Sequence, residues 1–162
     1  MVETWEAFFL GELGAAAGLL GLLFVAVSIN LSKIIESGGL TDRALVALVL
    51  LLQILVDSSM MLIPNQMPLA IGLEIIGVSA IAGIFGTFVG VHAIRLAKTR
   101  ARTIHESWSL VLFAIAVAPC LIGGAIVLGG DTNGLYWLAA GICFSFVKAV
   151  SDAWVFLVEI NR

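Results

Sequence analysis

The chain has 162 residues, of which 61% are hydrophobic and 12% are charged, and its mean hydropathy is +1.15. Soluble globular domains carry roughly a quarter charged residues, so this composition excludes a soluble domain and predicts an all-α bundle of membrane-spanning helices that forms one domain over residues 1–162. The net charge of −3 and the lack of a basic stripe interleaved with aromatic residues argue against nucleic-acid binding.

Long apolar stretches separated by short polar breaks predict five transmembrane helices. We expect them at about residues 5–30, 44–63, 69–95, 108–129 and 135–159, with the first helix continuing to the glycine pair at 38–39. The positive charges that flank these spans all fall on one side: Lys33, Arg43, Arg95, Lys98, Arg100, Arg102 and Arg162. The positive-inside rule assigns that side to the cytoplasm, so the N-terminus is predicted outside and the C-terminus inside.

The first and third segments carry small residues at helical packing intervals. Gly14 and Gly18 form a Gly-x-x-x-Gly motif, and Ala82, Gly86 and Gly90 follow one another at four-residue spacing. Small residues let the backbone of another helix approach closely, so we expect both ladders to pack, with the first and third segments as candidate partners. A ligand groove along the first ladder is the alternative.

Two pairs of polar residues lie inside predicted spans. Gln53 and Asp57 in the second segment, and Lys148 and Asp152 in the fifth, are each four residues apart and therefore share a helix face. A charge near the centre of a membrane helix costs roughly 2.5–3.5 kcal/mol, so these groups are expected to be buried against protein or water. Aligning the midpoints of the two spans predicts a bridge from Lys148 to Asp57, with Gln53 beside it and Asp152 as the partner within the same helix.

Two further acids, Glu12 in the first segment and Glu74 in the third, extend these pairs into a staggered column of polar groups. The predicted column comprises Glu12, Gln53, Asp57, Glu74, Lys148 and Asp152. Such columns are typical of proton or cation paths. The alternative is a structural clamp that sets the helix register without transport. Because five helices enclose little interior, a pore would run through a homo-oligomer.

Nothing in the sequence favours an enzyme or a bound cofactor. Cys120 and Cys143 lie in apolar segments without metal-ligand spacing, so we interpret them as small hydrophobic residues. His92 is expected to be an interfacial residue, because haem ligation would need a second inward histidine and only His105 remains, in the basic loop. No hydrolase or phosphate-binding motif occurs, and no metal site or catalytic residue is predicted.

The opening WEAFFLGELGAAAGLLGLLFVAVSINL, the acid in the second span and the closing SDAWVFLVEI resemble small uncharacterised bacterial integral membrane proteins, some of them labelled modulators of the FtsH protease. The resemblance implies a multi-pass protein of the bacterial inner (plasma) membrane and supplies no established active residues. It draws attention to Ser28 and Asn30 near the end of the first helix, which need hydrogen-bond partners.

Two functional hypotheses follow from the sequence. The first is an oligomeric membrane protein that conducts cations or protons along the polar column. The second is a non-conducting accessory or regulatory subunit of another membrane complex, with a membrane protein as its partner. The lipid bilayer is the surrounding medium in both.

Overall fold

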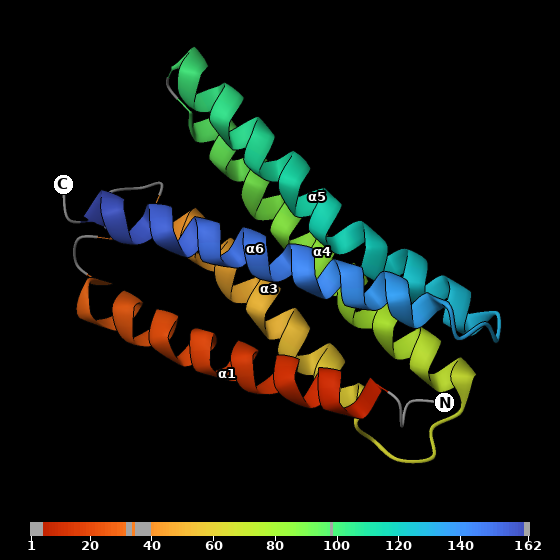
Figure 1. Ribbon diagram of the computed structural model, residues 1–162. Coiled ribbons are helices and arrows are strands. Elements are labelled where there is room, and N and C mark those ends of the chain that lie inside the picture. The colour runs from red at the N-terminus through yellow and green to blue at the C-terminus, as the bar shows by residue number, and fades with distance from the viewer. Residues whose placement is uncertain (1–4, 32–33, 35–39, 98, 161–162) are drawn as a thin grey trace.

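A computed structural model describes residues 5–31, 34, 40–97 and 99–160, and the chain folds there into an all-helical bundle (Figure 1). The helices are α1 (Glu6–Ile29), α3 (Leu40–Met61), α4 (Pro68–Leu96), α5 (Arg100–Leu128) and α6 (Gly134–Ile160). The predicted extension of the first helix to residues 38–39 lies outside the described residues. So do three of the positive charges, Lys33, Lys98 and Arg162.

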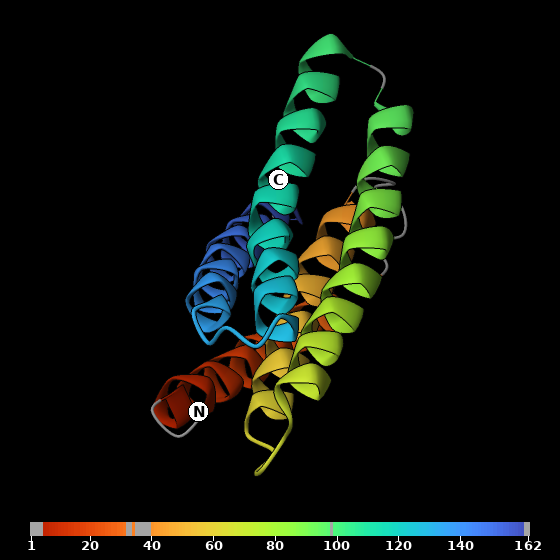
Figure 2. The ribbon, with the colours of Figure 1, turned by 90° about the vertical axis from the view of Figure 1, so that its right-hand side faces the viewer.

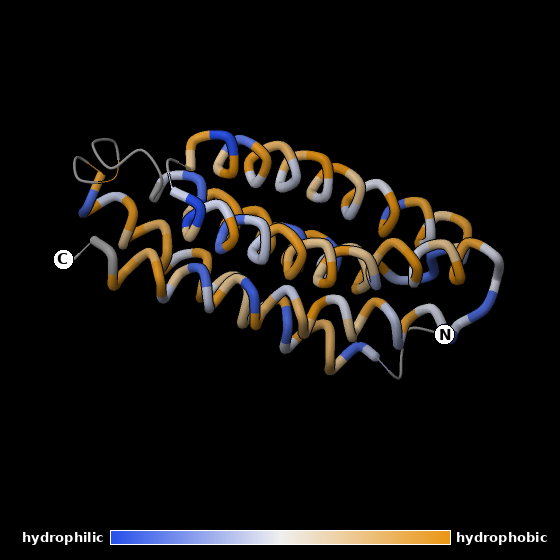
Figure 3. Tube along the Cα trace, turned by 90° about the horizontal axis from the view of Figure 1, so that it is seen from above, coloured by the Kyte–Doolittle hydropathy of each residue, from blue (hydrophilic) through white to orange (hydrophobic). Residues whose placement is uncertain are grey.

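All five helices are long and apolar enough to cross a bilayer, which confirms the predicted all-helical fold with five candidate membrane spans. Figure 3 shows apolar residues along most of each helix, with hydrophilic residues near helix ends and at a few positions within the helices. Two boundaries differ from the prediction. The second helix runs from Leu40 to Met61 rather than from 44 to 63, and the fourth begins at Arg100, eight residues before the predicted start at 108.

The helix α3 lies at the centre of the bundle, because it packs against α1, α4 and α6. In its apolar window 56% of the residues are buried, against 11% in that of α1, which lies at the edge of the bundle (Figure 1). The N-terminal end of α1 and the C-terminal end of α6 lie at opposite ends of the bundle, as an odd number of crossings requires (Figure 1).

A long hairpin of α4 and α5 forms the other side of the bundle (Figure 2). Each of these helices has 29 residues, or roughly 43 Å at 1.5 Å per residue. The hydrocarbon core of a bilayer is only about 30 Å thick, so the hairpin must tilt or extend beyond it. Figure 2 shows the C-terminal end of α4 and the N-terminal end of α5 rising past the other helices.

The predicted packing of the first ladder of small residues against the second is wrong. Gly86 and Gly90 of α4 face α5 instead: a Cβ on Gly86 would overlap the ring of Phe113, and one on Gly90 would come within 2.7 Å of Leu110. Ala82 is buried on the same face. The helix α1 packs mainly on α3, through a face opposite its glycines.

The glycine face of α1 has no neighbour within the described chain. A Cβ built on Gly14 or Gly18 would find no heavy atom within 4 Å, apart from the nearby backbone of its own helix, and Gly11 and Gly21 are equally open. Phe9, Ala16 and Leu23, which are buried, lie on the other side of the helix. This face is therefore free to contact lipid or another chain.

Candidate functional site

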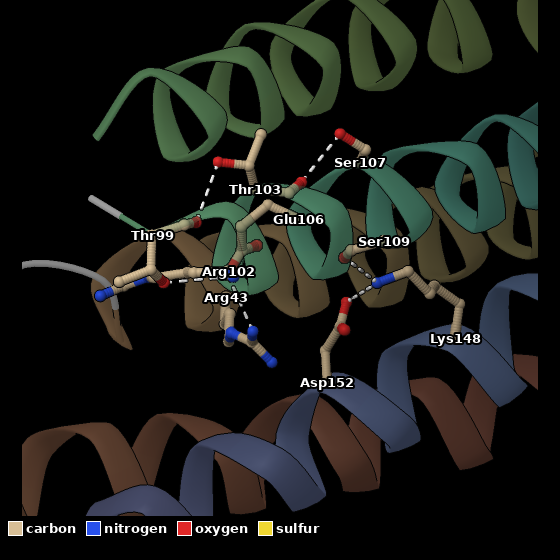
Figure 4. A network of polar contacts seen from close by, with 9 residues as sticks. All are labelled: Arg43, Thr99, Arg102, Thr103, Glu106, Ser107, Ser109, Lys148 and Asp152. Carbon is tan, nitrogen blue, oxygen red and sulfur yellow. Dashed lines mark hydrogen bonds and ion pairs between the residues drawn. The ribbon is translucent and has the colours of Figure 1, made fainter. Parts of the chain in front are cut away.

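Polar side chains from three helices meet near the end of the bundle that carries Arg95, Arg100 and Arg102 (Figure 4). We call this group the basic-end network, and it consists of Arg43 on α3, Glu106 and Ser109 on α5, and Lys148 and Asp152 on α6. It contains two cations and two anions, so its formal charge is zero.

Each charge in the basic-end network has a partner. The guanidinium Nη2 of Arg43 donates to Oε1 of Glu106 at 2.8 Å. The ammonium of Lys148 donates to the hydroxyl Oγ of Ser109 at 3.0 Å and to the carboxylate of Asp152. The side chains of these four charged residues are between 5% and 10% exposed. Burial to this degree is tolerated because the hydrogen bonds and opposite charges replace water.

Helical spacing explains how these residues come together. Lys148 and Asp152 lie one turn apart on α6, while Glu106 and Ser109 lie three residues apart on α5, so each pair shares one face. Figure 4 shows the α6 pair pointing towards Ser109. Arg43 lies within electrostatic range of Asp152 as well as bonding to Glu106. The network therefore links α3, α5 and α6 electrostatically.

Cavities adjoin the basic-end network on two sides. One of about 20 Å³ is lined by residues that include Asp42, Arg43, Glu106 and Asp152, and it has room for one water molecule. A wider groove of about 260 Å³ is lined by Lys148 and Asp152 together with apolar residues of α5 and α6. The smaller cavity thus leaves space for a water molecule beside the network.

A second polar group, which we call the Asp57 cluster, lies deeper in the bundle and comprises Gln53 and Asp57 on α3, Ser79 on α4 and Cys120 on α5. Gln53 Nε2 donates to Ser79 Oγ at 3.1 Å, and the Cys120 thiol lies within electrostatic range of Asp57. Asp57 is 1% exposed. Neither carboxyl oxygen of Asp57, nor Oε1 of Gln53, has a hydrogen-bond partner among the described residues.

The predicted bridge from Lys148 to Asp57 is not formed. The alternative pair within α6, Lys148 with Asp152, is formed instead. Lys148 pairs with Asp152 and Ser109. Both groups include a residue of α5: Ser109 in the basic-end network and Cys120 in the Asp57 cluster. These two residues are eleven positions apart, or roughly 16 Å along the helix axis. The two polar groups are thus distinct sites rather than one seam.

The error has a geometric cause. The midpoint of α3, which spans Leu40 to Met61, lies three residues earlier than that of the predicted span, a shift of roughly 4.5 Å. Asp57 consequently lies further from the basic end than expected. The midpoint of α6 falls where it was predicted, so Lys148 stays in place and finds the acid one turn away on its own helix.

The remaining predicted column residues lie apart from both groups. Glu74 accepts a hydrogen bond of 2.8 Å from Nε2 of Gln66 in the turn before α4. Glu12 is half-buried on α1, within electrostatic range of Cys143 of α6. These acids are therefore not continuous with the Asp57 cluster.

The remaining polar residues singled out in the sequence have local partners. Ser28 donates to the carbonyl oxygen of Phe24 at 2.8 Å, and Asn30 Nδ2 donates to that of Ala26 at 2.9 Å. The imidazole of His92 is 54% exposed and lies 3.4 Å from the carboxylate of Asp42, as suits an interfacial position.

Arg43, Glu106 and Ser109 were not predicted from the sequence as members of a buried site. Glu106 lies outside the predicted fourth span, which was expected to begin at 108, whereas α5 begins at Arg100. One signal was available: Glu106 is the only acid in the basic stretch from 95 to 108. An isolated acid among cations is a candidate for an ion pair.

In comparisons with known proteins, no family model matches the chain, and neither a curated protein nor a solved structure matches it. The resemblance to small bacterial membrane proteins therefore stays a prediction.

Proposed function

We propose that the protein transports protons or small cations across a bacterial inner membrane as a homo-oligomer, with its N-terminus outside and its C-terminus in the cytoplasm. The observation that carries this proposal is Asp57, a carboxyl group buried in a membrane-spanning helix with no hydrogen-bond partner for either oxygen among the described residues. A buried ionisable group without a partner is costly, so its retention favours a role in moving charge.

The basic-end network lies between the Asp57 cluster and the basic end of the bundle, and in this proposal it holds α3, α5 and α6 together beside the route. Its cavity for water touches Asp152 and Glu106, which gives an entrance from the basic end. Between this network and the Asp57 cluster lies the buried hydroxyl of Ser145, which donates to the carbonyl oxygen of Ala116 at 3.4 Å. Polar groups thus recur along the bundle, at separations that water molecules or side-chain motion would have to bridge.

Flux through reconstituted liposomes tests the proposal. Vesicles that contain the protein and a pH-sensitive or cation-sensitive dye should respond to an imposed potential, and Asp57→Asn should lower the response to that of empty vesicles. The matched control is Asp131→Asn, which makes the same change in an exposed turn and should leave flux unaltered. Equal flux from empty vesicles and the unmodified protein, under both polarities of potential, would refute transport.

A non-conducting accessory subunit is the second candidate, and the open glycine face of α1 favours it. Gly14 and Gly18 present a face on which another helix could pack closely, with no competing contact inside the chain. Gly14→Cys, combined with Cys143→Ser and labelled at its thiol with a photoactivatable crosslinker, should then capture a different membrane protein. A crosslink between two copies of this chain would instead support the homo-oligomer.

A further inference from the structure

We propose that the ion held by the Asp57 cluster is a proton, bound as a neutral carboxylic acid whose O–H donates to Oε1 of Gln53. This inference deepens the proposed transport function and rests on it for its physiological meaning, but it concerns the state of one side chain and can be tested without flux.

The first argument is a count of donors and acceptors. An ionised aspartate only accepts hydrogen bonds, and the amide oxygen of Gln53 also only accepts. Both oxygens of Asp57 and Oε1 of Gln53 are buried and without partners among the described residues, while Gln53 Nε2 uses one of its two N–H groups in the bond to Ser79. Because Gln53 and Asp57 are one turn apart on α3, a proton on the carboxyl group supplies a donor to Gln53 Oε1, which the amide's own second N–H cannot do.

The second argument concerns charge. Of the described residues, the titratable group that faces Asp57 from a neighbouring helix is the thiol of Cys120 on α5, which provides no positive charge. Arg43 lies fourteen residues away on the same helix, or roughly 21 Å along its axis, and Lys148 is held by Asp152. An ionised Asp57 would therefore be a buried charge with no counter-charge.

The third argument separates a proton from a metal cation. Hard cations such as calcium or magnesium ions take six or more oxygen ligands. The unpartnered oxygens of the cluster are two from Asp57 and one from Gln53, with the hydroxyl of Ser79 nearby. A proton needs only two oxygens, one as its covalent site and one as its acceptor. Loading takes one proton from water, and unloading returns it.

Infrared spectroscopy of the protein in lipid at neutral pH tests the inference. A protonated carboxyl group gives a carbonyl stretch above the amide I band, and we expect this band in the unmodified protein. It should disappear in Asp57→Asn and persist in Glu12→Gln, which makes the matched change at a half-buried acid of α1. In Gln53→Leu the band should shift to higher frequency, because the acid loses its acceptor.

Thermal unfolding gives a second measurement. The amide of asparagine has the shape of a neutral carboxyl group and can also donate to Gln53, so Asp57→Asn should leave the unfolding temperature unchanged if the acid is protonated. Replacing choline by sodium or potassium in the buffer should not stabilise the protein.

The outcomes separate this inference from the proposed function. The absence of the band at neutral pH, its persistence in Asp57→Asn, or stabilisation by sodium that Asp57→Asn abolishes would overturn the bound proton. If sodium flux still occurred in these cases, transport would stand with a different ion. If the band depends on Asp57 but the protein shows no flux, the bound proton is supported and the transport function is refuted.

Discussion

The basic-end network and the Asp57 cluster are both buried and polar, but they differ in how far their groups are satisfied. In the basic-end network two cations face two anions, and every charged side chain has an ion-pair partner. In the Asp57 cluster one carboxyl group and one amide oxygen lack hydrogen-bond partners among the described residues. Satisfied networks of this kind hold helices in register, whereas an unsatisfied acid is the more informative sign of function.

The difference also separates two interpretations that the sequence left open. A clamp and an ion path were alternatives for one predicted seam. With two separate sites, the paired charges of the basic-end network favour the clamp, and the unpartnered Asp57 is the basis of the proposed ion path. Substitutions in each site should therefore have different consequences, and the following predictions are ordered by the size of the expected effect.

The largest loss of stability is expected for Arg43→Met. This residue faces both Glu106 and Asp152, so its removal leaves two buried carboxylates near one another with Lys148 as the remaining cation. Breaking a buried pair costs about 3–5 kcal/mol in the free energy of unfolding. Thermal or denaturant unfolding in detergent micelles measures it, with Arg95→Met at an exposed position as the control.

The double variant Arg43→Met with Glu106→Leu should recover most of this loss, because both charges are removed together. An equal loss in the single and double variants would show that the ion pair is not what stabilises the basic end.

A smaller effect, about 3 kcal/mol, is expected for Lys148→Met, because Arg43 still lies near Asp152 and offsets part of its charge. A second substitution that restores the stability lost in Lys148→Met identifies the acid that pairs with Lys148. Adding Asp152→Leu should restore stability, whereas adding Asp57→Leu should not. Unfolding measurements on the two double variants therefore distinguish the observed pair from the one predicted by span alignment.

In the Asp57 cluster, Gln53→Leu should cost less than either substitution above. It removes the neutral hydrogen bond to Ser79 on α4, together with the one that we propose from Asp57 within α3. Neutral hydrogen bonds between membrane helices average about 0.6 kcal/mol with a maximum near 1.7. A double-mutant cycle with Ser79→Ala isolates the coupling across the 3.1 Å contact between the two side chains. A coupling of several kcal/mol would mean that this cluster also acts as a clamp.

The smallest effect is expected for Ser109→Ala in the basic-end network, at or below about 0.6 kcal/mol. Lys148 loses one neutral acceptor but keeps the carboxylate of Asp152. The same unfolding assay applies. A loss comparable to that of Lys148→Met would indicate that the serine is essential for holding the ammonium.

The sequence alone determined the class of the protein and its local pairs. Five apolar stretches of membrane-spanning length predict five helices, because lipid offers no hydrogen bonds to the backbone and each crossing must satisfy its own. The pair of Lys148 and Asp152 was foreseeable as the alternative within one helix, since residues four apart on a helix are neighbours whatever surrounds them.

Only the tertiary structure decided which helices meet, and at what depth. Hydropathy does not specify where a helix starts to within a turn, and three residues at the midpoint of α3 are enough to place Asp57 out of reach of Lys148. Nor does it specify helix rotation, so the pairing of Arg43 with Glu106 and the burial of Gly86 against Phe113 could not be derived. Contacts between helices depend on side chains far apart in the sequence, and a periodicity read within one helix carries no information about its neighbour.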